Sequence, residues 1–189
     1  MIAIVLIAGL QVRPQSFLPS MGKLQISITG DPLTSIPLSV TCHGNSNHGG
    51  KGGQAQNLTS LVVSVFSVQV HRTGVLNPTG DWLNVTTFPK TLDLLSLKSL
   101  TQLGSIGVTD GVINRVRLSV GPTATADSNL GPVSVIVSSS HLDAQVNAQV
   151  TSGKVTSITL EFVQPHVVCE GNGDFRLTPA LTATSETTD

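Results

Sequence analysis

Apolar and polar residues alternate along much of this chain, and residues 110–120 show the pattern most clearly. A period of two is that of a β-strand with one buried face and one solvated face. The face predicted to be buried holds Val112, Val116, Leu118 and Val120. The opposite face holds Ile113, Arg115, Arg117 and Ser119. We expect the rest of the fold to be organised around this strand.

Shorter runs of the same kind predict a mostly β chain. They occupy residues 23–30, 36–41, 61–71, 82–86, 124–127, 133–138, 145–150, 154–163 and 174–182. Turn residues separate them at spacings typical of an all-β sandwich of immunoglobulin-like kind. A short helical turn is expected near residues 97–104. The predicted organisation is an apolar segment with a proline-containing linker at 1–21, a β-sandwich domain at 22–183 and a polar tail at 184–189.

Composition narrows the function classes. Only 11% of the residues are charged, and Ser and Thr supply about a fifth of the chain. Soluble domains usually carry about a quarter of charged residues, and a weakly charged, hydroxyl-rich surface is common outside cells. The net charge of −1, with scattered Lys and Arg, gives neither a nucleic-acid footprint nor a polybasic cluster for membranes. We expect a secreted or cell-surface protein.

The first twelve residues are almost wholly apolar. This segment is too short for a transmembrane helix but has the length of the apolar region of a signal peptide. No Lys or Arg precedes it and no clear cleavage motif follows. A signal peptide, a helix and a strand therefore stay open. As a strand it could add to the sheet edge of a neighbouring copy, and such head-to-tail pairing generates a filament unless it closes into a ring.

Two further features fit an exported protein. Cys42 and Cys169 are the only cysteines, and in an oxidising compartment we expect them to pair. The alternative is two unrelated buried thiols. Asn57 and Asn84 begin N-glycosylation sequons, whereas the proline after Asn77 excludes that position.

Some polar groups are candidate sites. We expect Asp93 and Arg117 to form a structural ion pair, because a charge on an inner strand generally needs a partner; a ligand-binding Arg117 is the alternative. His43 and His48 lie in a Gly-rich loop, but two histidines fall short of the three or four ligands of a zinc site. A solvated loop is the preferred interpretation.

Glu170, Asn172 and Asp174 place oxygen ligands at every second residue of a Gly-rich turn, which resembles half of a calcium loop. The full loop spacing is absent, so an ordinary hairpin turn is preferred and no metal or cofactor is expected. Residues 138–143 contain Ser, His141 and Asp143, but catalytic triads are assembled from separate elements and no nucleophile elbow is present. The sequence therefore predicts a protein that is not an enzyme.

Several segments, in this order, resemble a family of exported bacterial and archaeal proteins known only as a domain of unknown function, DUF4382. They are residues 22–31, 65–72, 82–83, 92–97, 111–118, 153, 158–162 and 175–179. The resemblance covers roughly residues 22–183. It implies a secreted or lipid-anchored β-sandwich of transthyretin-like kind and supplies no catalytic residues. This chain lacks the lipobox cysteine common in that family, has Ile113 where an aromatic is usual, and inserts the loop at 42–53.

Two function classes follow. The preferred one is a non-enzymatic extracellular structural protein, a subunit of a cell-surface filament or assembly joined by strand donation, whose partners are copies of itself. The alternative is a monomeric secreted or surface-anchored adhesion or carbohydrate-binding module, which should show exposed aromatics on one face or a concave site. An aromatic content of 3% without tyrosine favours the structural class. No small-molecule substrate is evident.

Overall fold

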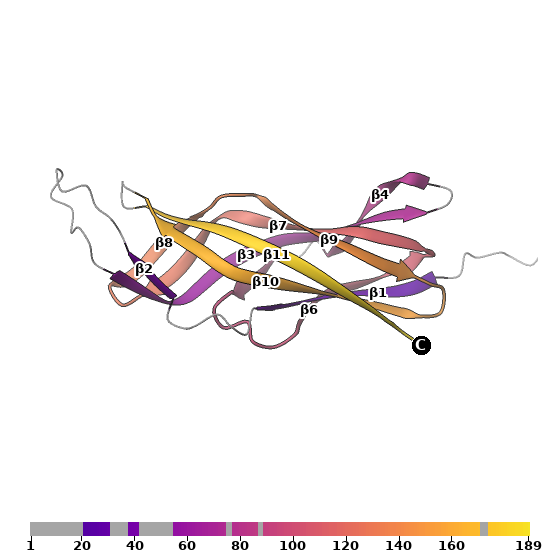
Figure 1. Ribbon diagram of the computed structural model, residues 1–189, viewed down its shortest axis with the longest axis horizontal. Helices are drawn as coiled ribbons and strands as arrows, with labels where there is room; N and C mark the ends of the chain where they lie inside the picture. Colours follow the sequence, from indigo (N-terminus) through magenta and orange to yellow (C-terminus); the bar gives the residue numbers. More distant parts are fainter. Residues whose placement is uncertain (1–20, 31–37, 42–54, 75–76, 87–88, 171–173) are drawn as a thin grey trace, which may run out of the picture.

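The computed structural model describes residues 21–189, apart from 31–37, 42–54, 75–76, 87–88 and 171–173. The described residues form strands and no helix, so the expectation of an all-β fold is confirmed (Figure 1). Among them there is accordingly no apolar helix of membrane-spanning length. The strands are β1 (Met21–Gly30), β2 (Leu38–Thr41), β3 (Ala55–Gly74), β4 (Asn77–Thr86), β5 (Lys90–Asp93), β6 (Thr101–Thr109), β7 (Gly111–Ser128), β8 (Gly131–Val137), β9 (His141–Val150), β10 (Val155–Cys169) and β11 (Phe175–Thr188).

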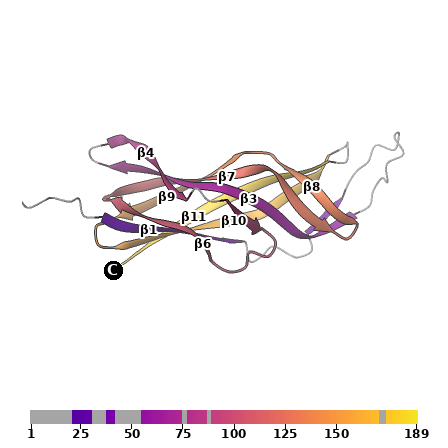
Figure 2. The same ribbon diagram turned by 180° about the vertical axis from the view of Figure 1, so that it is seen from behind.

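All these strands belong to one sheet that does not close on itself. Hydrogen-bonded neighbours follow the order β2-β3-β7-β8-β11-β10-β1-β6, while β4 and β5 also pair with β3 and β9 also pairs with β7. Figures 1 and 2 show the molecule from opposite sides, with β3 and β7 running along one half and β10 and β11 along the other. The assignment to a transthyretin-like or immunoglobulin-like sandwich is finer than this topology and stays a prediction.

The two halves of the sheet share one apolar core. Along β1 the predicted alternation holds, because Leu24, Ile26 and Ile28 are fully buried. The other half contributes residues such as Val70 and Leu118, which are also fully buried. Burial of apolar surface stabilises a fold by about 25 cal/mol per Å². This continuous core therefore holds the polar outer faces of the strands in fixed positions.

The central strand β7 follows its predicted pattern only in part. Val116, Leu118 and Val120 are buried as expected. Nearer the start of the strand the expectation is wrong, because Ile113 is fully buried and Val112 is only half-buried.

A β-bulge explains this reversal. In the pairing of β7 with β3, Ile113 lies opposite Arg72 and Arg115 lies opposite His71, so β7 has one residue more than β3 at this point. A bulge adds one residue to a strand and turns the neighbouring side chains to the opposite face. Here the added residue is Asn114, and both Asn114 and Arg115 are exposed.

The helical turn expected near residues 97–104 is not present. Residues 94–96 form a turn instead, and β6 follows. The Asp93 carboxylate oxygen Oδ1 accepts a hydrogen bond from the Leu95 N–H at 3.1 Å, and the Asp93 carbonyl accepts one from the Ser96 N–H at 3.2 Å. One bond between residues three apart closes a β-turn rather than a helix.

The C-terminal residues also differ from expectation. Residues 184–188, predicted to be a polar tail, continue β11 and pair with β10 as far as Thr188 opposite Val155. Threonine is β-branched and favours a strand even where its side chain is exposed.

Candidate functional site

The outward face of β4, β3, β7 and β9 carries two rows of mostly polar side chains. Residues directly opposite each other in neighbouring strands point to the same side of the sheet, so the ladder register fixes these rows. One row holds Trp82, His71, Arg115 and Gln145. The next row holds Asn84, Gln69, Arg117 and Asp143. We call the residues of these two rows the polar face.

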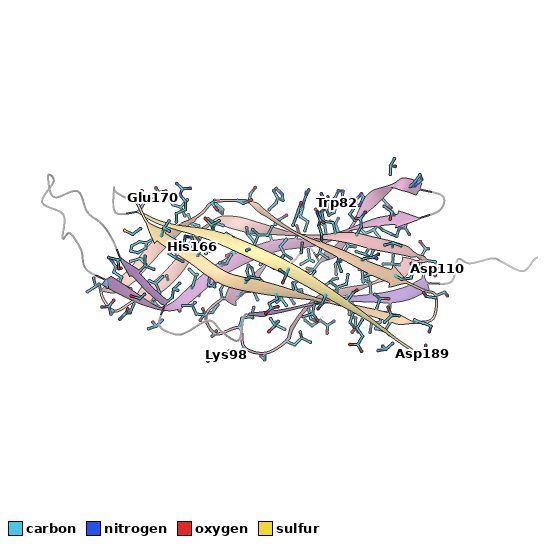
Figure 3. All side chains as sticks on the ribbon, viewed as in Figure 1. Trp82, Lys98, Asp110, His166, Glu170 and Asp189 are labelled. Atoms are coloured by element: carbon cyan, nitrogen blue, oxygen red, sulfur yellow. The ribbon has the colours of Figure 1, made fainter. Side chains whose placement is uncertain are left out.

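Trp82, the only tryptophan of the chain, lies over Arg117 on the polar face. The guanidinium carbon of Arg117 is 4.4 Å from the centroid of the indole ring, which is a cation–π contact. The ring of His71 lies beside the indole, with 5.1 Å between the centroids and an interplanar angle of 57°. Trp82 keeps 36% of its surface exposed, and Figure 3 shows it at the outer surface of the molecule.

Arg117 is held in place by Asp143. Its Nε donates to Asp143 Oδ1 at 2.7 Å and its Nη2 donates to Oδ2 at 2.8 Å, which is a bidentate geometry. These hydrogen bonds lower the pKa of Asp143 and raise the pKa of Arg117 further. Both groups therefore stay charged at neutral pH.

Arg115, the second cation of the polar face, forms no bidentate pair with a carboxylate. Arg115 Nη1 lies 3.9 Å from Asp143 Oδ2, the same oxygen that accepts the hydrogen bond from Arg117. The side chain of Arg115 is 45% exposed. Two guanidinium groups thus share one carboxylate, which leaves a surplus positive charge on the polar face.

Two local features position these side chains. The bulge at Asn114 presents that residue next to His71, with Asn114 Oδ1 and His71 Nδ1 2.8 Å apart. The first part of β4, just before Trp82, contains Gly80 at a φ of 77°. A side chain at residue 80 would collide with the ring of His71, because an added Cβ comes within 2.5 Å of it. Glycine at this position therefore allows His71 to lie beside Trp82.

A cavity of about 400 Å³ continues from the polar face at the seam between β9 and β11. It is lined by Ser138, Ser139, His141, Leu142 and Asp143 on one side and by Thr178, Pro179, Ala180 and Leu181 on the other. Asp143 thus belongs both to the polar face and to the cavity. The arrangement combines a partly exposed indole, two cations and amide side chains, which suits the binding of an extended polar ligand.

The predicted ion pair of Asp93 with Arg117 does not form, and each group has another partner. Asp93 Oδ1 accepts hydrogen bonds from the backbone N–H groups of Leu61 and Leu95, at 2.9 and 3.1 Å. Arg117 lies on the outward face of β7, where Asp143 of the neighbouring strand is directly opposite. Asp93 pairs with Val62 of β3, whereas Arg117 pairs with Gln69 of the same strand. The two side chains therefore lie at different positions along β3 and do not meet.

The candidate metal ligands receive no support from the described residues. The Glu170 N–H donates to the Asp174 carbonyl at 2.8 Å, as in a hairpin turn, and the Glu170 carboxylate accepts a hydrogen bond from Arg176 at 2.6 Å. That bond lowers the pKa of Glu170. In the part of the chain that the structure describes, no three His, Cys, Asp or Glu residues are grouped for a metal. Asn172, His43 and His48 lie outside the described residues.

The hydroxyl, imidazole and carboxylate groups of residues 138–143 are not arranged as a triad. Ser140 Oγ lies 3.0 Å from His141 Nδ1, but the Asp143 carboxylate binds Arg117 instead of orienting the imidazole. A triad needs its carboxylate on the second ring nitrogen of the histidine.

The cysteine and glycosylation predictions remain open. Cys169, at the end of β10, is not a free thiol, but Cys42 lies outside the described residues, so their pairing stays a prediction. Asn84 is exposed on β4 and accepts a hydrogen bond from Gln69 at 2.8 Å, and Asn57 is half-buried in β3. Use of either sequon stays a prediction.

The sequence does not mark Trp82 as a site residue, and it offers Asp143 only as a member of a catalytic triad. A partial signal exists, since both occupy exposed positions of alternating strands. Their meeting at Arg117, however, depends on the register of β4, β3, β7 and β9.

Comparison with known proteins gives one match. A family model described as "Domain of unknown function (DUF4382)" matches residues 52–179, which is more than half of the chain. The match begins later than the resemblance seen in the sequence, which started near residue 22. No curated protein matches the chain, and no solved structure does.

Proposed function

This chain belongs to the DUF4382 family, and we propose that it is a non-enzymatic extracellular binding module that recognises carbohydrate through the polar face. One observation carries the proposal, namely the partly exposed indole of Trp82 held over Arg117 at the outer surface of the sheet. The apolar C–H face of a sugar ring packs well on an aromatic ring, while its hydroxyls need polar partners beside that ring.

The surroundings of Trp82 supply such partners. Asn84 and Gln69 offer amide groups in the adjacent row, and the cavity at the seam between β9 and β11 extends the surface beyond Asp143. Neighbouring strands lie about 4.8 Å apart, so the face from β4 to β9 spans about 14 Å. An oligosaccharide is long enough to use this length, whereas a single sugar is not.

The extracellular location rests on composition. A charged fraction of 11%, two cysteines and two sequons are together typical of an exported protein. A sandwich of the kind implied by the family would suit this role, because rigid strands on either side of a core present a fixed outer face.

Affinity electrophoresis in gels that contain neutral or acidic polysaccharides tests the proposal. We expect at least one polymer to retard the protein and Trp82→Ala to lose most of that retardation, since buried tryptophan contacts commonly dominate binding. Phe66→Ala is the matched control. Like Trp82, Phe66 is an exposed aromatic residue, but it belongs to β3 and lies outside the polar face. Equal retardation of Trp82→Ala and wild type, or no retardation by any polymer, contradicts the proposal.

A second function, assembly of copies by strand donation, is favoured by a different observation. Within the described residues β6 pairs only with β1, so its other edge has no ladder partner. The Nζ of Lys90 donates to the carbonyl of Gln102 in β6 at 2.9 Å. Lysine side chains commonly protect a free sheet edge, and an added strand would displace this one. The proposed donor, residues 1–12, lies outside the described residues.

A chain that begins at Met21 tests this second function. Strand donation predicts that the shortened chain is monomeric, that the full chain assembles, and that an added peptide of residues 1–15 binds the shortened chain. Sedimentation velocity distinguishes these states. If both chains assemble alike, or if the full chain stays monomeric at high concentration, strand donation is wrong.

A further inference from the structure

We infer that the carbohydrate bound by the polar face is acidic, and that Arg115 binds its carboxylate. The inference rests on the proposed function and adds the chemical class of the ligand. Its basis is the unequal charge of the polar face, where Arg115 and Arg117 share the single carboxylate of Asp143.

The geometry separates the roles of the two arginines. Both hydrogen bonds between Arg117 and Asp143 are short and well directed, and the indole of Trp82 covers the Arg117 guanidinium. Arg117 is therefore a structural support of the indole. Arg115 makes no contact with Asp143 shorter than 3.9 Å and is more exposed than Arg117, at 45% against 30%. Its guanidinium donors are available to a ligand.

Arg115 is also correctly placed relative to the indole. It lies two residues before Arg117 on the same outward face of β7, and its row also contains Trp82 and His71. A sugar ring stacked on the indole would therefore direct a substituent towards Arg115. A planar guanidinium matches a carboxylate through two parallel hydrogen bonds.

The bulge in β7 supports this reading of Arg115. Without Asn114, which is the extra residue of β7 relative to β3, residues before and after it would continue one alternation, and the exposed pair Asn114 and Arg115 would not form. Bulges occur often beside functional sites, where they redirect a side chain. Here the bulge adds an amide next to the exposed cation.

Other charged groups near the face do not cancel this charge. Arg72 and Asp81, in the next opposed pair of β3 and β4, bind each other at 3.4 Å. The remaining polar-face residues Gln69, Asn84 and Gln145 are neutral amides. Among the described residues of these strands, Arg115 is thus the cation that a ligand carboxylate would meet first.

Titration calorimetry with polygalacturonate and with its fully methyl-esterified form tests the inference, because the two polymers share a backbone and differ in charge. We expect the acidic polymer to bind at least tenfold more tightly, and this preference to shrink as NaCl is added. Arg115→Gln should lose about tenfold in affinity for polygalacturonate and little for the ester.

Arg176→Gln is the matched control, since it removes the same charge from β11 beside Glu170, at the far end of the molecule from Trp82 (Figure 3). An equal loss in both variants would show that only bulk charge matters and would overturn the inference. Equal binding of the acidic polymer and its ester would overturn it while leaving the proposed function standing.

Two other results are decisive. Polyglutamate that binds as tightly as polygalacturonate, with the same dependence on Arg115, would replace the sugar by an acidic peptide and overturn the inference. If no acidic or neutral polysaccharide binds, the proposed function itself fails and the inference fails with it.

Discussion

Arg117 connects the main groups of the polar face, since it binds the Asp143 carboxylate and lies under the indole of Trp82. Exposed ion pairs usually contribute about 0–1 kcal/mol. The bidentate geometry and the cation–π contact place this one near the upper end, because the contact with the ring adds about 0.5–1 kcal/mol at exposed sites.

We therefore expect Arg117→Gln to lower the free energy of unfolding by about 1 kcal/mol, and Arg115→Gln to change it by less than about 0.5 kcal/mol. Urea unfolding followed by the fluorescence of Trp82 measures both. A larger effect at Arg115 than at Arg117 would contradict the assignment of Arg117 as the structural cation.

The lowered pKa of Asp143 makes this contribution depend on pH. A carboxyl group whose pKa is lower in the folded state stabilises the fold above its ordinary pKa of about 3.9, and that stabilisation is lost as the pH falls through the lowered value. The difference in unfolding free energy between wild type and Asp143→Asn should be constant from about pH 5 to 7 and shrink below about pH 4. A difference that grows on acidification would mean that the pKa of Asp143 is raised.

The partner of Arg117 could not be read from the sequence. Asp143 is on another strand, 26 positions away, and the two meet because β7 and β9 pair in one particular register. A change of register by one residue would place Asp143 on the opposite face. Sequence alternation identifies which side chains face outward but not which outward residues are neighbours.

At the scale of single strands, alternation identified most of the fold and failed where a strand is irregular. In β7 the bulge at Asn114 reverses the orientation of Val112 and Ile113. In β6 glycines interrupt the pattern, and Gly104 sits where an added Cβ would come within 3.0 Å of Val85. Glycine is required where two strands approach closely, and it interrupts the alternation of apolar residues. The sequence of this stretch therefore does not predict a strand.

The bulge leads to a direct comparison of substitutions. Ile113→Ala and Leu118→Ala should each lower the free energy of unfolding by about 2–5 kcal/mol, because both side chains are fully buried. Val112→Ala should cost clearly less, since Val112 is half-buried. Chemical denaturation of the three variants measures these free energies. A larger loss at Val112 than at Ile113 would mean that Val112 faces the core, as an unbroken alternation predicts.

At the scale of the whole molecule, strands that are distant in the sequence are brought into contact. β2 ends at Thr41, just before Cys42, and β2 packs against β10, which ends at Cys169. A disulfide between the two cysteines would close a loop of more than a hundred residues and stabilise the fold by roughly 4–5 kcal/mol in the chain-entropy model.

We expect the native protein to take up no iodoacetamide, and the reduced, unfolded protein to be alkylated at both cysteines. Mass spectrometry of the intact chain reads both states. Alkylation of both cysteines in unfolded protein that was never reduced would exclude the bond.

Carbohydrate binding by the polar face around Trp82 can be observed residue by residue. The experiment is a titration of the ¹⁵N-labelled protein with oligogalacturonate and, in parallel, with the methyl-esterified form, followed by nuclear magnetic resonance. The chain has a single tryptophan, so the indole N–H of Trp82 gives one assignable signal. We expect this signal and the backbone signals of β4, β3, β7 and β9 to shift on addition of the acidic oligomer, and to shift more weakly with the ester. Unchanged indole signals with both oligomers, or shifts confined to the opposite end near Glu170, would contradict it.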